Sequence, residues 1–194
     1  MSNQTITPRA GSLAAVGQPA YSFGHLKLHP GMYFYPYMLA YLAASAGLTA
    51  VYDGAHYPDF LKDTLGIFPS PLAGSGTLVT LEPVVTLARD GITLPQTEAE
   101  SRLSCMLVNT AFESLTDAQR DGLKVHKEGE FFRHARHASS HGNKWSFLAN
   151  EPKRPAEWKG VVLDRVAFQG KRFIHGTLTP GDLLFLLADI EKLL

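Results

Sequence analysis

Residues 131–143, with the sequence FFRHARHASSHGN, decide the fold expected of this chain and its chemistry. Apolar and small side chains recur there at helical spacing, which predicts an amphipathic helix from about Glu128 to His141. The side chains expected on its inward face are Phe131, Phe132, Ala135, Ala138 and Ser139. Gly142 follows the helix and suits the left-handed backbone conformation that ends many helices.

The same helix concentrates cationic and titratable side chains. An arginine stays charged at any working pH and can hold a phosphate group with two hydrogen bonds. A histidine takes or gives a proton near neutral pH. Arg136 and His141 therefore supply what cleavage of RNA by its own 2′-hydroxyl needs, namely a proton shuttle and a positive clamp for the developing charge.

The order Arg136-His137-x-x-x-His141, followed by Gly142-Asn143, resembles the signature of the HEPN superfamily. That signature is an arginine, then Asn, Asp or His, then three residues and a histidine near the end of a helix. The resemblance extends over residues 97–143 and, less closely, over 179–194. An aromatic helix near 31–52 would be the first helix of the bundle.

The resemblance implies a two-fold dimer in which two motif helices meet in one composite cleft. Active members of the family cut RNA without a metal and leave a cyclic phosphate and a 5′-hydroxyl, whereas other members only bind. It implies that Arg136 binds and polarises the scissile phosphate and that His141 is the general base or acid. His137 would orient the pair or the phosphate, and Arg133 and Asn143 are further supporting residues.

The partners that the resemblance implies are RNA or a nucleotide, a second copy of the chain and an antitoxin-like protein. The biological setting would be bacterial defence or a toxin–antitoxin system, and no cofactor is expected. The alternative function is a non-catalytic HEPN module that binds nucleotides, RNA or another protein.

Structural roles for the two principal residues stay open. Arg136 could instead only pair with a carboxylate, such as Glu130 or a neighbour on another helix. His141 could stabilise a helix end through the helix dipole. Side chains five residues apart on an ideal helix diverge by ~140°. Arg136 and His141 of one subunit therefore converge only if the helix end bends, and a dimer relieves this because each partner can supply what the other lacks.

The histidines also allow a rival interpretation as metal ligands. His137 and His141 are four residues apart, which can place two imidazoles on one helical face, and His134 precedes them. A third ligand would have to come from Asp53 or His56. Because no HExxH pattern accompanies them, we expect no metal site.

Helix-start signals elsewhere complete the predicted bundle. Residues 97–100 and 116–119 both have the capping-box pattern, so the chain is expected to bend at Ser114-Leu115 between two helices. The last helix should start at Thr179-Pro180-Gly181-Asp182, with a threonine cap, a proline and an acid.

A β-hairpin is predicted before the last helix. Residues 161–168 and 171–174 are rich in strand-forming side chains and flank Gln169-Gly170, which places the hairpin at about 161–175. The fold class is therefore mainly α, a helical domain with a hairpin inserted before the last helix, and the resemblance implies an antiparallel HEPN-like bundle. One domain spans 1–194, with a long irregular insertion at about 53–96 that holds a short extended run at 77–81.

Composition and charge set the remaining expectations. The formal net charge is zero, but residues 124–172 hold eleven Lys and Arg against five Asp and Glu, a local charge of +6 that suits a polyanion. The single cysteine, Cys105, excludes an internal disulfide and is expected to be a buried, inert thiol. The uncharged stretch from Pro30 to Tyr52 is expected to form a helix buried in a soluble, cytoplasmic protein, and not a membrane span.

Overall fold

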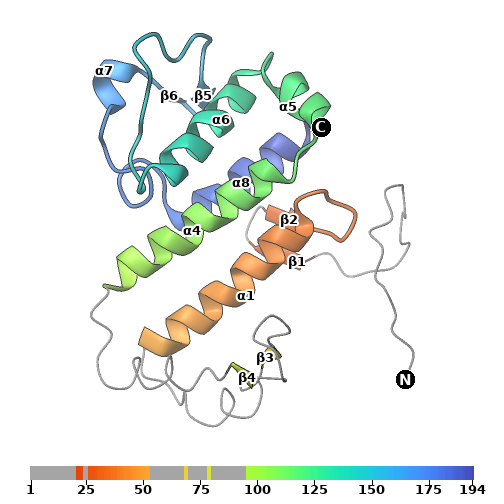
Figure 1. Cartoon of the computed structure of the whole chain (residues 1–194). Helices are drawn as coiled ribbons and strands as arrows, with labels where there is room; N and C mark the ends of the chain where they lie inside the picture. Colours follow the sequence, from red (N-terminus) through yellow and green to blue (C-terminus); the bar gives the residue numbers. More distant parts are fainter. Residues whose placement is uncertain (1–20, 24–25, 53–67, 70–77, 80–94) are drawn as a thin grey trace.

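The computed structural model describes residues 21–23, 26–52, 68–69, 78–79 and 95–194 (Figure 1). The N-terminal elements are β1 (Tyr21–Phe23), β2 (Leu26–Leu28), α1 (Tyr35–Tyr52), β3 (Phe68–Pro69) and β4 (Leu78–Val79). The later elements are α4 (Gln96–Glu113), α5 (Asp117–Leu123), α6 (Lys127–Ser140), β5 (Glu157–Trp158), β6 (Val161–Val162), α7 (Arg165–Phe168) and α8 (Pro180–Glu191). The fold is mainly helical with a small hairpin before the last helix, as predicted.

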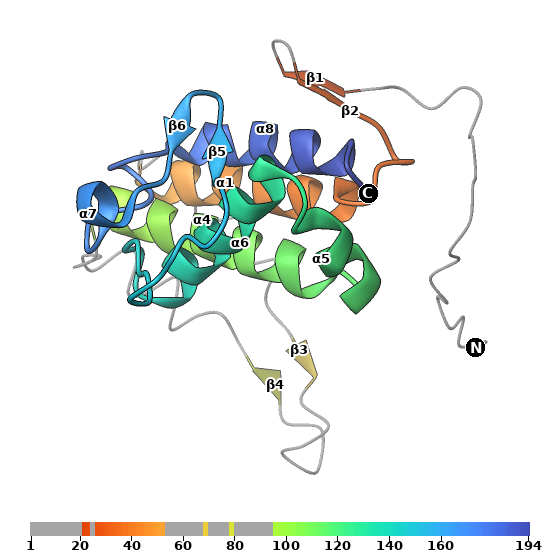
Figure 2. The ribbon, with the colours of Figure 1, turned by 90° about the horizontal axis from the view of Figure 1, so that it is seen from above.

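Helix α4 is the centre of the bundle. It packs against α1 on one side and against α6 and α8 on the others (Figures 1 and 2). Aromatic rings join these layers, since Phe132 of α6 meets Phe34 and Phe112 edge-on at centroid distances of 6.2 and 5.4 Å. The predicted inward face of α6 is confirmed, because its five side chains are all buried. Burial of such apolar area is the main stabilising contribution.

The bend between α4 and α5, one of the two predicted capping boxes and the predicted threonine cap of the last helix are confirmed. Thr116 caps α5 with Gln119, and Thr179 caps α8 with Asp182. The capping box predicted at 97–100 is wrong, because α4 starts two residues earlier, after Pro95, and no side chain caps it. Glu100 instead accepts a hydrogen bond from Gln96 within the first turn.

The hairpin before the last helix lies earlier than predicted. Its strands β5 and β6 pair around Lys159 and Gly160, which both have a positive φ. The prediction of strands at 161–168 and 171–174 is wrong. The Asp164 side chain accepts a hydrogen bond from the Ala167 amide at 2.8 Å, and this contact starts helix α7. In the second predicted strand, the backbone of Arg172 forms an isolated β-bridge with Lys144 and no extended strand pairing.

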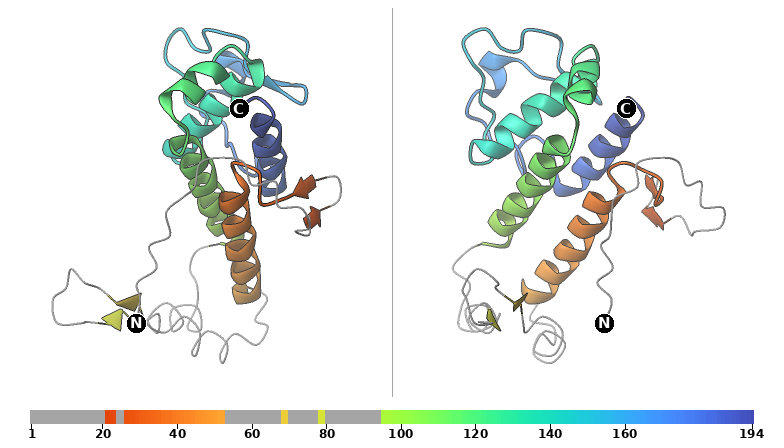
Figure 3. Two further views of the ribbon diagram at one scale, coloured as in Figure 1. Left: turned by 90° about the vertical axis from the view of Figure 1, so that its right-hand side faces the viewer. Right: turned by 45° about the vertical axis from the view of Figure 1, so that its right-hand side comes forward.

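Helix α1 confirms the helix predicted in the uncharged stretch, but the described residues cover only one of its faces. Phe34, Met38 and Tyr41 are buried, whereas Leu39 on the other face is 45% exposed. Glu191 at the end of α8 accepts hydrogen bonds from the amides that precede α1 and so ties the two helices together (Figure 3). Among the described helices, none combines the length and apolar character that crossing a bilayer requires.

Most of the predicted insertion at 53–96 lies outside the described residues. The described part contains the short antiparallel pair β3–β4, in which Leu78–Val79 falls within the extended run predicted at 77–81. Asp53 and His56, the distant ligands of the metal interpretation, lie outside the described residues.

Candidate functional site

The predicted motif lies along the outer side of α6 and at its C-terminal end. Arg136 and His137 are half-buried, and Ser140 and His141 are exposed. His141 ends the helix, and its amide donates to the carbonyl oxygens of His137 and Ala138. The turn that follows is left-handed, with a φ of 69° at Gly142, as predicted.

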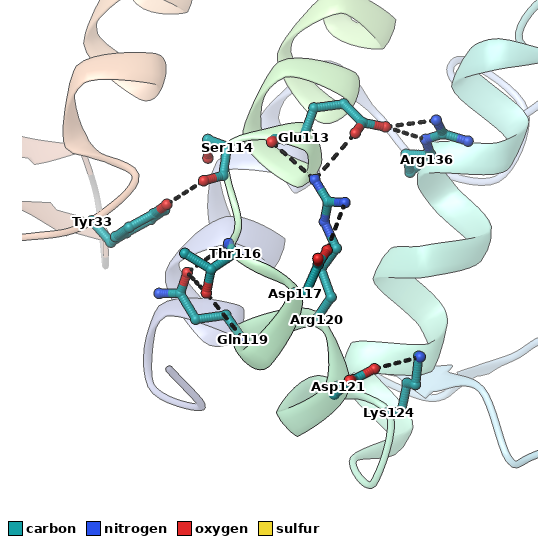
Figure 4. Close-up of polar contacts among 10 residues, drawn as sticks. All are labelled: Tyr33, Glu113, Ser114, Thr116, Asp117, Gln119, Arg120, Asp121, Lys124 and Arg136. Carbon is teal, nitrogen blue, oxygen red and sulfur yellow. Dashed lines mark hydrogen bonds and ion pairs between the residues drawn. The ribbon is translucent and has the colours of Figure 1, made fainter.

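Arg136 binds a carboxylate from another helix. Its Nε and Nη2 both donate to Oε1 of Glu113, at 2.9 and 2.6 Å (Figure 4). Of the two structural alternatives, the structure therefore has the carboxylate on another helix and not Glu130. Glu113 also binds Arg120. Nη2 of Arg120 donates to the Glu113 Oε2 at 3.2 Å and to the Glu113 carbonyl oxygen at 2.9 Å. One carboxylate at the end of α4 therefore holds guanidinium groups from α5 and α6.

Arg120 is a residue that the sequence analysis missed. Its guanidinium carbon and that of Arg136 lie 5.4 and 5.9 Å from the ring centroid of Phe112, so both cations face the same aromatic ring. The seven-residue spacing between Glu113 and Arg120 does not predict a contact, because side chains that touch on a continuous helix are three or four residues apart. It becomes a contact because the chain turns at Thr116, which the capping box did predict.

His137 and His141 come together at the end of α6. Their ring centroids are 5.0 Å apart in an edge-on arrangement. Nδ1 of His137 is buried and has no hydrogen-bond partner among the residues that the structure describes. Burial and the charge of His141 lower the pKa of His137 below its ordinary value of 6.5. The His137 imidazole is therefore neutral near pH 7 and able to accept a proton.

Arg133 belongs to a different cluster. Its Nη2 binds Glu130 and Glu151 at 2.8 and 3.0 Å and lies 2.9 Å from Nε2 of the buried His134. Burial opposes ionisation of Glu130, but hydrogen bonds from His134 and Arg133 outweigh it and hold its pKa at about 2. This cluster fastens α6 to the loop at 148–151, so Arg133 supports the helix and is not part of the exposed site.

Asn143 is also a structural residue in this arrangement. It is buried, and its side chain accepts from the Ile174 amide at 2.7 Å and donates to the Ile174 carbonyl at 3.2 Å. The thiol of Cys105 lies 3.8 Å from the Asn143 Oδ1, and burial raises the pKa of that thiol, in agreement with an inert cysteine. Asn143 therefore links the end of α6 to the segment before α8.

No metal-binding group is present in the part of the chain that the structure describes, since no three His, Cys, Asp or Glu side chains there are arranged to hold an ion. His134 is directed toward Glu130 and Phe147, with a ring-centroid distance of 5.0 Å to Phe147. His134 therefore has other contacts and does not join the His137–His141 pair. The pair of half-buried His137 and exposed His141 lies apart from His134.

No family model matches this sequence, and no curated protein and no solved structure is found to be similar to it. The resemblance to the HEPN superfamily therefore depends on the motif residues and on the order of the helices. Of the five predicted site residues, the structure brings the rings of His137 and His141 together, whereas Arg136 of the same helix binds Glu113. It assigns Arg133 and Asn143 to contacts within the fold.

Proposed function

We propose that this protein is a metal-independent endoribonuclease of the HEPN type. The observation that carries the proposal is the imidazole pair of half-buried His137 and exposed His141 at the end of α6, on the same helix as the guanidinium of Arg136. A neutral imidazole and a permanent cation beside each other on a solvent-facing surface suit proton transfer at a phosphodiester.

The reaction would be an in-line attack by the RNA 2′-hydroxyl on the adjacent phosphorus. One imidazole takes the hydroxyl proton as the new P–O bond forms, and the bond from phosphorus to the 5′-oxygen breaks. The leaving oxygen receives a proton, which leaves a 2′,3′-cyclic phosphate and a 5′-hydroxyl. Arg136 neutralises the charge on the phosphate oxygens, His141 is the general base or acid, and His137 orients the phosphate or the second imidazole.

A second copy of the chain is part of the proposal. Met106 on the outer face of α4 is 64% exposed, and one turn further on Asn109 accepts a hydrogen bond from Ser140 of α6 at 3.0 Å. A two-fold contact over this α4–α6 face would bring two α6 ends together in one cleft. Mixing Arg136→Gln with His141→Ala subunits should then restore cleavage if Arg136 of one subunit acts with His141 of the other.

A non-catalytic module that binds RNA or a nucleotide is the second candidate. The observation that favours it is that Arg136 contacts Glu113 of α4 and not the imidazole pair, so a phosphate that replaced the carboxylate would be bound by arginine without needing a histidine. An antitoxin-like protein partner and a role in bacterial defence or toxin–antitoxin biology follow from the family resemblance only.

The test is a cleavage assay on mixed RNA in EDTA with wild type, His141→Ala and a control variant. His126→Ala is the control, because His126 is an exposed histidine that precedes the same helix and caps it with no side-chain hydrogen bond. Cleavage with cyclic-phosphate ends by wild type and His126→Ala, but not by His141→Ala, supports the proposal. Absence of cleavage by all three folded proteins, with RNA bound, supports the binding module.

A further inference from the structure

The carboxylate of Glu113 occupies a site made by two arginines from two different helices. Arg136 binds one carboxylate oxygen through two nitrogen atoms, and Arg120 binds the other oxygen through Nη2 (Figure 4). Two guanidinium groups that converge on one anion are an arrangement that a phosphate group also satisfies, because its oxygens accept the same forked hydrogen bonds.

The arginines have supports other than the Glu113 carboxylate. Both guanidinium groups face the ring of Phe112, and Arg120 also donates to the Glu113 backbone carbonyl and lies 3.6 Å from Asp117. Removal of the carboxylate charge should therefore leave the two cations near their present positions. A phosphate that replaced the carboxylate would meet donors that are already oriented.

The Glu113 carboxylate is open to replacement. Its side chain is 50% exposed, and those of Arg136 and Arg120 are 35% and 28% exposed. Ion pairs with this exposure contribute little to stability, because water screens them and competes for the charges. A ligand phosphate, which carries its own charge and three or more acceptor positions, can compete with such a carboxylate.

A cavity that could hold more of a ligand lies next to Arg120. Arg120 and Phe112 line a cavity of about 350 Å³ between α4, α5 and the start of α6. Lys124 and Arg133 also line the cavity, as do Asp117 and Asp121, and Lys124 lies 2.6 Å from Asp121. The buried Nε of Arg120 has no hydrogen-bond partner in the described parts of the chain. A chain of phosphates bound at Arg136 could therefore extend past Arg120.

We propose that Arg120 and Arg136 together form one binding site for a backbone phosphate of single-stranded RNA, and that Glu113 occupies this site until the phosphate displaces it. The inference rests on the proposed function, because it concerns the phosphate that Arg136 would bind there. Arg120 is then a second phosphate ligand, and Glu113 is a competing anion that weakens binding of RNA.

The experiment measures binding without cleavage. A fluorescent single-stranded oligonucleotide with 2′-deoxy sugars has no attacking hydroxyl, so anisotropy titrations at several salt concentrations report binding alone. Glu113→Gln keeps the shape of the side chain and removes its charge. Glu98→Gln is the matched control, because Glu98 lies at the other end of α4, is 38% exposed and also contacts two arginines, Arg102 and Arg172, at 3.2 Å each.

Glu113→Gln is expected to bind about fivefold more tightly than wild type, the effect of removing one exposed competing charge. Glu98→Gln should change affinity by less than about twofold, since surface charges so far apart are largely screened. Arg120→Gln should weaken binding and lower the salt dependence by about 0.7, the value for one lost phosphate contact on a single strand. Arg120→Lys, which keeps the charge but not the fork, should weaken binding less.

Two results would overturn the inference. One is weaker or unchanged binding by Glu113→Gln, which would make Glu113 a residue that positions Arg136. The other is unchanged affinity and salt dependence in a folded Arg120→Gln or Arg120→Lys protein. Neither outcome decides whether wild type cleaves RNA, so failure of the inference and failure of the proposed ribonuclease activity are distinguished.

Discussion

Glu130 should make the stability of this protein depend on acid pH through the cluster that anchors α6. Its side chain is only 6% exposed and accepts hydrogen bonds from Arg133 at 2.8 and 3.2 Å. The same carboxylate lies 3.4 Å from Nε2 of His134. The substitution Glu130→Gln imitates the protonated acid, because it keeps the shape and removes the charge. It should therefore destabilise the protein most where Glu130 is ionised.

The size of the effect follows from the pKa of Glu130, which falls from an ordinary 4.5 to about 2 in the folded protein. A lowered folded-state pKa means that the stabilisation is fully present above pH 4.5 and is lost as the pH falls toward 2. A difference of roughly 2.5 units corresponds to about 3 kcal/mol at pH 7 and about 1.4 kcal/mol at pH 3. Breaking a buried ion pair by removing one partner costs ~3–5 kcal/mol, which agrees with the upper value.

Urea denaturation of wild type, Glu130→Gln and Glu128→Gln between pH 3 and 7 measures this effect. Glu128→Gln is the matched control, because it makes the same charge change on the same helix where no ion pair is present among the described residues. The gap between wild type and Glu130→Gln should narrow from about 3 to about 1.4 kcal/mol as the pH is lowered. A gap that is the same at pH 3 and 7 would refute an ionised, stabilising Glu130.

Three further outcomes are expected. Gly129→Ala should cost roughly 1–3 kcal/mol in urea denaturation, because a Cβ there would lie 2.1 Å from the Leu123 carbonyl oxygen. Asn143→Ala should cost about 2 kcal/mol or more, because it removes two buried hydrogen bonds at a residue with a φ of 63°; a loss below about 0.5 kcal/mol would contradict this. His141→Gln should raise the pKa of His137 toward 6.5 in an NMR titration, and an unchanged value would show that burial alone lowers it.

The helices were predictable because their signals are local. The apolar spacing on α6 and the boxes at Thr116 and Thr179 depend on residues at most a few positions apart. The hairpin was misplaced for a related reason. Residues 161–168 are strand formers by composition, but the Ala167 amide donates a hydrogen bond to the Asp164 carboxylate and so starts a helical turn that composition does not reveal.

The contacts of the site residues were not predictable from spacing on one helix. The structural partner expected for Arg136 was a carboxylate such as Glu130 or one on another helix, and Glu130 pairs instead with Arg133 and His134 of its own helix. The partner of Arg136 is Glu113, 23 residues earlier, which only the packing of α4 on α6 brings within reach. Long-range charge pairing of this kind depends on tertiary packing, which a single sequence does not encode locally.

The contact between Glu113 and Arg136 bears directly on whether Arg136 can act on a substrate together with His141. Arg136 faces α4 and α5, whereas the chain turns away after His141 through two residues with positive φ. Within one subunit, Arg136 can therefore serve a phosphate near His141 only if it leaves Glu113 or if Glu113 gives way. Displacement by the phosphate predicts that activity rises when the charge of Glu113 is removed. A composite site in a dimer predicts instead that activity depends on protein concentration and is recovered by mixing complementary inactive subunits.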